Sequence, residues 1–149
     1  MTRKLFGAAA VAAVISAGCF SVTRQSSGPS GSGQMLAGTW ASIGSGSLQD
    51  NCTNFTWAVT EFTGNSAAGT FSATCYGILQ VAGTARATFL TGSTLSWSVT
   101  ATASGPGVPA ICSVSITGTA TIETDQIRIP YSGTSCLGPL SGTEIVRRR

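Results

Sequence analysis

Few residues of this 149-residue chain could perform acid–base or nucleophilic chemistry. It has no histidine and one lysine, and its carboxylates are widely spaced along the sequence: Asp50, Glu61, Glu123, Asp125 and Glu144. A serine or threonine nucleophile needs a neighbouring base and a third group that orients that base. The sequence dictates no such triad, no metal-ligand spacing and no phosphate-binding loop. We therefore predict a protein that is not an enzyme and has no catalytic residues, no metal site and no cofactor.

The amino-terminal segment has the three parts of an export signal. The basic pair Arg3-Lys4 precedes an apolar stretch over residues 5–15, and small residues then lead to Cys19. Residues Ile15–Cys19 resemble the lipobox of bacterial lipoproteins, in which small residues precede a cysteine that becomes lipidated, although Ser16 stands where leucine is usual. The resemblance implies a lipid anchor on this cysteine in the bacterial cell envelope. The alternative is ordinary signal-peptidase cleavage, which gives a soluble secreted or periplasmic protein.

The other four cysteines predict two disulfides. They pair off completely if the first cysteine of the chain carries lipid. Cys52 and Cys75 are centred on the turn signal at residues 64–66, and Cys112 and Cys136 are centred on the turn at residues 123–125. Each pair therefore lies at mirrored positions across a predicted hairpin, where cross-chain Cα distances suit a disulfide. We predict the pairs Cys52–Cys75 and Cys112–Cys136.

Composition divides the chain into a signal peptide over residues 1–18, a Ser/Gly-rich tether over 19–34 and one folded domain over 35–149. The chain is 42% hydrophobic and only 9% charged, which favours a packed domain over a disordered one. Its formal net charge of +3 is too small to predict a nucleic-acid partner. The predicted partner is the membrane, reached through the lipid on Cys19. The arginines at 147–149 either touch anionic head groups or only aid solubility.

From Met35 onward the chain shows short alternating segments, which are typical of antiparallel β structure. In residues 95–99, for example, apolar side chains alternate with serine, so that one face of the strand is buried and the other is wet. These segments predict eight strands: Leu36 to Ala41, Phe55 to Phe62, Gly69 to Tyr76, Ile78 to Phe89, Thr94 to Ala103, Ile111 to Ile122, Gln126 to Tyr131, and Leu140 to Val146. We predict an all-β fold, a single antiparallel up-and-down eight-stranded barrel. An immunoglobulin-like β-sandwich is the alternative.

Up-and-down order of the strands places both disulfides and the long connections at 42–54, 104–110 and 132–139 at one end of the barrel. The tether and the arginines at 147–149 then lie at the other end. A loop-rich mouth is thus predicted to face away from the membrane.

The run Leu36-Ala37-Gly38-Thr39-Trp40, with seven more strands behind it, resembles the calycin group of eight-stranded barrels, which includes lipocalins and avidins. In that group a Gly-x-Trp on the first strand closes the barrel floor. The strand around Trp97 is similar to an avidin strand, but Ala101 stands where avidins have a further tryptophan, so biotin binding is not implied. Membrane-bound lysozyme inhibitors are also small barrel lipoproteins, and their inhibitory Ser-Gly motif lies in the barrel. Here the sequence Ser30-Gly31-Ser32-Gly33 lies in the tether.

Several large aromatic side chains are predicted to point into the barrel: Trp40, Phe55, Trp57, Phe71, Phe89, Trp97 and Tyr131. They either fill the interior or leave a ligand pocket near the mouth lined by Trp57, Trp97 and Tyr131. Arg86 or Arg128 would be the polar anchor, although strand parity places Arg86 outside. We predict a non-catalytic, lipid-anchored envelope protein that binds a small apolar ligand or a partner protein at the mouth. The alternatives are a structural, surface-displayed domain with a solid core and no ligand, and an envelope inhibitor of a hydrolase such as lysozyme.

Overall fold

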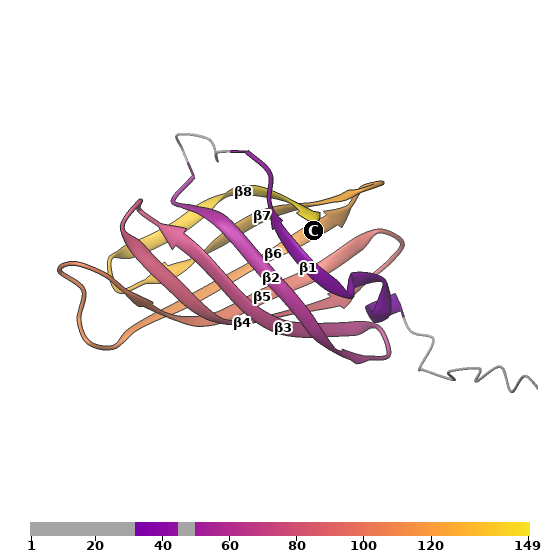
Figure 1. Ribbon diagram of the computed structural model, residues 1–149, viewed down its shortest axis with the longest axis horizontal. Coiled ribbons are helices and arrows are strands. Elements are labelled where there is room, and N and C mark those ends of the chain that lie inside the picture. The colour runs from indigo at the N-terminus through magenta and orange to yellow at the C-terminus, as the bar shows by residue number, and fades with distance from the viewer. Residues whose placement is uncertain (1–31, 45–49) are drawn as a thin grey trace, which may run out of the picture.

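The computed structural model describes residues 32–44 and 50–149, which form a closed barrel of eight antiparallel strands in sequence order (Figure 1). After a 3-10 helix, η1 (Ser32–Leu36), come β1 (Gly38–Ser42), β2 (Cys52–Thr63), β3 (Ser66–Cys75), β4 (Leu79–Phe89), β5 (Thr94–Ser104), β6 (Cys112–Ile122), β7 (Gln126–Ser135) and β8 (Gly138–Arg148). The predicted up-and-down barrel is confirmed. The predicted signal peptide, the lipobox Ile15–Cys19 and the tether up to residue 31 lie outside the described residues.

The barrel wall is built from alternating buried and exposed positions, most regularly in β5. There Leu95, Trp97 and Val99 are buried, while the two serines between them are exposed. The sheet closes because β1 pairs with β8, with Trp40 opposite Arg148 and Ser42 opposite Val146. Closure leaves no free strand edge, which excludes the alternative sandwich, and it turns one face of every strand into a single core.

Strands β7 and β8 are longer than predicted. A tight turn at Cys136 and Leu137 connects them, so the expected long connection over residues 132–139 is wrong. Its glycine-rich sequence suggested a loop, but Gly133 lies inside β7, where a Cβ atom would stand 2.1 Å from the Ser115 carbonyl oxygen on β6. Glycine is therefore needed there for close approach of two strands and not for a turn.

The start of the folded domain also differs from the prediction. Residues Ser32 to Gln34, expected in the tether, and Leu36, expected in the first strand, belong to η1. The helix packs on the barrel because Leu36 is fully buried and the Gly33 amide donates a hydrogen bond of 3.2 Å to the Gly64 carbonyl in the β2–β3 turn. Among the described residues no helix is long and apolar enough to cross a membrane.

The buried Trp40 side chain of β1 lies beside η1. Its indole Nε1 donates a hydrogen bond of 2.8 Å to the Leu36 carbonyl. The guanidinium of Arg148 lies 4.9 Å from the centre of the Trp40 ring, which is a cation–π contact. Arg148 also donates a hydrogen bond to the Met35 carbonyl. Arg148 on β8 thus contacts both β1 and η1 and stabilises their position on the barrel.

Candidate functional site

The two ends of the barrel carry different groups. At one end, which we name the loop end, lie the connections 43–51, 76–78, 105–111 and 136–137 and both disulfides. At the other end, which we name the tether end, lie η1, the end of β8 and the three remaining hairpin turns. The chain reaches the barrel at the tether end, opposite the long connections (Figure 1). The disulfides therefore lie at the end of the barrel opposite η1, as predicted.

Both predicted disulfides are present in the structure. Cys52 and Cys75 are direct Cα partners on β2 and β3, with their Cα atoms 3.9 Å apart. Cys112 at the start of β6 bonds to Cys136 just after β7, with a Cα separation of 5.3 Å. Cys136 is exposed, whereas the other three are fully buried. Such paired cysteines are typical of proteins that reside in oxidising, extracytoplasmic compartments.

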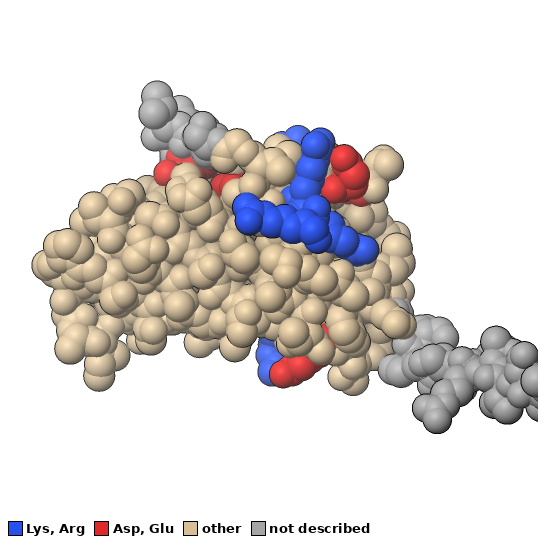
Figure 2. Space-filling model, in the orientation of Figure 1, with Lys and Arg blue, Asp and Glu red and all other residues tan. Residues whose placement is uncertain are grey.

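Charge is unevenly distributed between the two ends. The connections 76–78, 105–111 and 136–137 contain no charged residue. On the face seen in Figure 2, the left end is mostly tan with some acidic atoms at its upper edge, and the arginines lie farther to the right. The part of the loop end formed by these three connections is therefore uncharged, whereas the β1–β2 connection contributes Asp50.

Three large apolar side chains project from these uncharged connections, and we name them the apolar rim: Ile78, Ile111 and Leu137. Their exposed fractions are 52%, 80% and 47%. Ile111 and Leu137 flank the Cys112–Cys136 disulfide, and the Tyr76 hydroxyl donates a hydrogen bond of 2.6 Å to the Pro139 carbonyl. Two hairpin turns distant in sequence are thus tied together beneath the rim. The rim could not be predicted from the sequence, because exposed apolar residues in connections have no periodicity.

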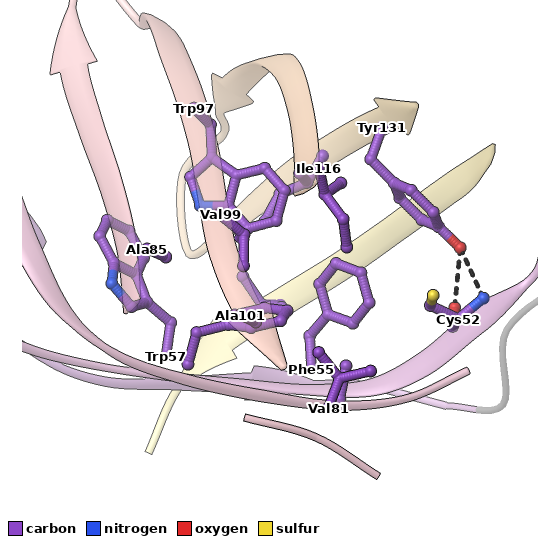
Figure 3. Packing of buried hydrophobic residues seen from close by; sticks show 14 of the residues in the cluster. Cys52, Phe55, Trp57, Val81, Ala85, Trp97, Val99, Ala101, Ile116 and Tyr131 are labelled. Atoms are coloured by element: carbon purple, nitrogen blue, oxygen red, sulfur yellow. Dashed lines mark hydrogen bonds between the residues drawn. The ribbon is translucent and has the colours of Figure 1, made fainter. Parts of the chain in front are cut away.

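The aromatic residues predicted to line a ligand pocket lie together inside the barrel and not at its mouth (Figure 3). Trp57, Trp97 and Tyr131 are all buried. The Phe55 ring stacks on Trp97 at 6.0 Å between ring centres and lies 5.3 Å from the Tyr131 ring. Phe71 makes edge contacts with both Phe55 and Trp97. Aromatic rings therefore fill the interior of the barrel, and the Tyr131 hydroxyl reaches the Cys52 backbone at the loop end.

The polar anchors considered for that pocket do not reach it. Arg86 is exposed on the outer face of β4, as strand parity predicts. Arg128 is also outside, where its Nε lies 3.2 Å from Glu123. Hydrogen bonds from Gln126 and Arg128 lower the pKa of the Glu123 carboxyl. In the residues that the structure describes, no three His, Cys, Asp or Glu side chains gather where a metal ion could be held.

Two indole groups inside the barrel lack hydrogen-bond partners. Nε1 of Trp57 and Nε1 of Trp97 are both buried, and neither has a partner among the described residues. In Figure 3 both nitrogens lie on the side of the cluster where Ala85 projects from β4. Buried donors of this kind usually bind a water or a ligand, because an unmade hydrogen bond is costly.

The hydroxyl of Tyr131 has a structural role. It accepts a hydrogen bond of 2.8 Å from the Cys52 amide and donates one of 2.9 Å to the Cys52 carbonyl. Gly142 makes room for it, since a Cβ atom there would stand 2.5 Å from this hydroxyl. Burial raises the pKa of Tyr131 to about 12, and its hydrogen bond to Cys52 opposes this shift. The negative charges of Asp50 and Glu144 raise the pKa of Tyr131 further.

Glu144 is a buried carboxyl on the inward face of β8, with 2% of its surface exposed. Burial raises its pKa, a hydrogen bond from Ser42 opposes the shift, and the charge of Asp50 adds to it. Its Oε2 atom has no hydrogen-bond partner among the described residues. Glu144 has the same strand parity as Leu140 and Val146, so the alternation in the sequence could have predicted that its side chain points inward.

We expect Glu144→Gln to remove a loss of stability that the wild-type protein undergoes as pH rises. The raised pKa means that the folded state holds the proton more tightly than the unfolded state. The wild-type free energy of unfolding is thus highest below the ordinary glutamate pKa of about 4.3 and decreases as pH rises through the folded-state pKa. Urea unfolding between about pH 4 and 8 measures this. The exposed Glu61→Gln is the control, and an unchanged pH profile in Glu144→Gln would contradict the expectation.

Comparison with known proteins supports the fold. No family model matches this chain, and no curated protein matches it. Among solved structures, the redesigned β-barrel mFAP1 bound to DFHBI is 19% identical with a TM-score of 0.55, covering 78% of this chain and 98% of that one. The redesigned barrel b11L5F_LGL is 17% identical with a TM-score of 0.53, covering 79% and 95%. The chain is therefore a closed eight-stranded barrel similar in architecture to these two designs.

Proposed function

We propose that this chain is a non-catalytic, lipid-anchored protein of the bacterial cell envelope that binds a partner protein through its loop end. The observation that carries the proposal is the apolar rim, which projects from three connections that contain no charged residue. A rim of this kind, together with the half-buried Tyr76 and Val108 beside it, has the composition of a contact surface.

The energetics favour the rim as a binding surface. Burying one large aliphatic side chain contributes about 1.5–3 kcal/mol. The Cys112–Cys136 disulfide and the Tyr76 hydrogen bond hold the connecting turns in place before a partner arrives. Binding then costs less conformational entropy than it would with flexible loops.

The proposed anchor on Cys19 places this surface at a distance from the membrane. The chain from Cys19 to Ser32 spans at most about 45 Å when fully extended. Because Ser32 lies at the tether end, the loop end is the part of the barrel farthest from the lipid. This arrangement suits a domain that reaches for a partner in the envelope.

A site-specific photo-crosslinker tests the proposal in the host cell. We expect a probe at Ile111 or Leu137 to give a cross-linked product of one discrete mass, and a matched probe at Ser98 on the barrel wall to give none. Ile78→Ser should reduce the yield at Ile111 roughly tenfold, since about 1.4 kcal/mol of apolar contact is lost. The partner's identity then decides whether it is a hydrolase such as lysozyme. Equal labelling at all three positions favours the structural, displayed domain instead.

The anchor is tested separately. We expect Cys19→Ser to move the protein from the membrane fraction into the soluble fraction, because lipid can no longer be attached. Fractionation followed by immunoblotting measures this, with Ser16→Leu as a control that restores the usual lipobox residue and keeps the protein on the membrane. Equal membrane retention of Cys19→Ser would contradict lipidation.

A second candidate function is binding of a small molecule inside the barrel. The unpartnered indole groups of Trp57 and Trp97 favour it, since they could donate to a ligand with hydrogen-bond acceptors. The barrel mFAP1, which has the same fold, is bound to the small molecule DFHBI. Titration with apolar molecules that carry a carbonyl should shift tryptophan fluorescence in the wild type, and the shift should be lost in Trp97→Phe. No shift with any compound leaves the interior as a solid core.

A further inference from the structure

We propose that the tether end carries a site for the anionic head group of a phospholipid. A hollow of about 410 Å³ opens there between η1, the β6–β7 turn and the end of β8. Its apolar wall is formed by Met35, Leu36, Trp40 and Ile122, and its polar wall by Glu123, Thr124, Asp125, Arg147 and Arg148. A volume of this size accommodates a small polar ligand with several contacts.

The arginines at this end suit a phosphate group. Arg148 is held over the Trp40 ring and against the Met35 carbonyl, so its guanidinium is already positioned. The Arg149 amide donates a hydrogen bond of 2.9 Å to the Thr39 carbonyl, which keeps that residue at the same end. An ordered guanidinium binds phosphate with two parallel hydrogen bonds.

The two carboxylates that line the hollow, Glu123 and Asp125, do not cancel the positive charge of this end, because each is paired with an arginine. Glu123 is paired with Arg128, and Asp125 lies 3.4 Å from Arg147. Within the described residues, Arg148 and Arg149 take part in neither ion pair. The tether end therefore has four arginines against two carboxylates, and an anionic ligand is favoured over a cationic one.

The apolar groups at this end favour a lipid over a free phosphate. Met35 is 64% exposed on η1, and Leu90 is exposed in the β4–β5 turn. Exposed apolar side chains beside arginines are typical of surfaces that lie at the membrane interface. The orientation of this end toward the membrane rests on the proposed anchor, since Ser32 begins here. The charge and shape of the hollow do not depend on the anchor.

Vesicle co-sedimentation of the Cys19→Ser chain, with the signal residues removed, tests the head-group site without the lipid anchor. We expect binding to vesicles of equal parts phosphatidylglycerol and phosphatidylcholine, and at least tenfold weaker binding to pure phosphatidylcholine. Arg148→Gln combined with Arg149→Gln should weaken binding about fivefold for each arginine, so roughly 30-fold in all. Arg86→Gln on the barrel wall is the matched control and should bind as the wild type does.

Three further arms separate the possible outcomes. Met35→Ser should also weaken binding, because the apolar contact is lost, whereas Ile111→Ser at the loop end should have no effect. Glycerol 3-phosphate in solution should bind at least tenfold more weakly than the vesicles. Equal binding to both vesicle types, equal binding of free glycerol 3-phosphate, or full binding by the double arginine variant would overturn the proposal. These results are independent of the cross-linking at the loop end, so the failure of either proposal can be recognised.

Discussion

Removing the Cys52–Cys75 disulfide lowers the free energy of unfolding by about 2–5 kcal/mol, the usual cost for a small disulfide-bonded domain. The bond closes a loop with a sequence separation of 23 residues, and so restricts the unfolded chain. Both cysteines are also fully buried, so alanine at both positions leaves unfilled space in the core. Urea unfolding of Cys52→Ala combined with Cys75→Ala measures the loss.

The second disulfide provides the comparison. Cys112 and Cys136 close a loop of nearly equal length, with a sequence separation of 24 residues. Cys136 is exposed, so replacing this pair with alanine removes less packing. We expect the Cys112–Cys136 pair to contribute less to the free energy of unfolding than the Cys52–Cys75 pair. The difference should equal the packing contribution of one buried side chain. Equal stability of the wild type and both double variants would show that the closed sheet alone maintains the barrel.

The Tyr131→Phe variant is expected to lose about 2–4 kcal/mol, although only one oxygen atom is removed. The Tyr131 hydroxyl satisfies both the amide and the carbonyl of Cys52, and both lie in the buried end of β2. Each buried polar group left without a partner costs about 1–3 kcal/mol. Tyr76→Phe is the matched control, because its hydroxyl makes one exposed hydrogen bond, typically about 0.5–1.5 kcal/mol.

Alkaline titration provides a second measure of the Tyr131 hydroxyl. Its pKa in the folded protein is raised to about 12, against about 10 for an ordinary tyrosine. This contribution to stability is therefore fully present below about pH 10 and is lost as the pH rises to about 12. In Tyr131→Phe this part of the alkaline loss should be absent. The same alkaline profile in wild type and variant would assign the loss to other groups.

The sequence alone determined the strands and their faces. Alternation of apolar residues with serine and threonine, as in β5, is a local property, because successive side chains of a strand point to opposite sides. The disulfide pairing followed from the same local order. In an up-and-down sheet, positions equidistant from a turn become neighbours, so Cys52 faces Cys75 across the β2–β3 hairpin.

The long-range contacts inside the barrel could not be derived in this way. Tyr131 meets Cys52 across 79 residues, and it does so only because β8 closes on β1 and the strands are tilted around the barrel. The same closure buries Glu144 and places Trp57 and Trp97 deep inside. Local alternation shows that such side chains point inward, but not how far along the barrel axis they lie.

The two candidate binding surfaces also depend on tertiary structure. The apolar rim brings Ile78, Ile111 and Leu137 together from three connections, and the tether-end hollow joins η1 to the end of β8. Residues in turns have no periodicity, so their neighbours are set by closure of the sheet and by the side chains that span its ends. The sequence therefore determined which residues form the wall of this barrel, whereas only closure of the sheet decided what lies at each end.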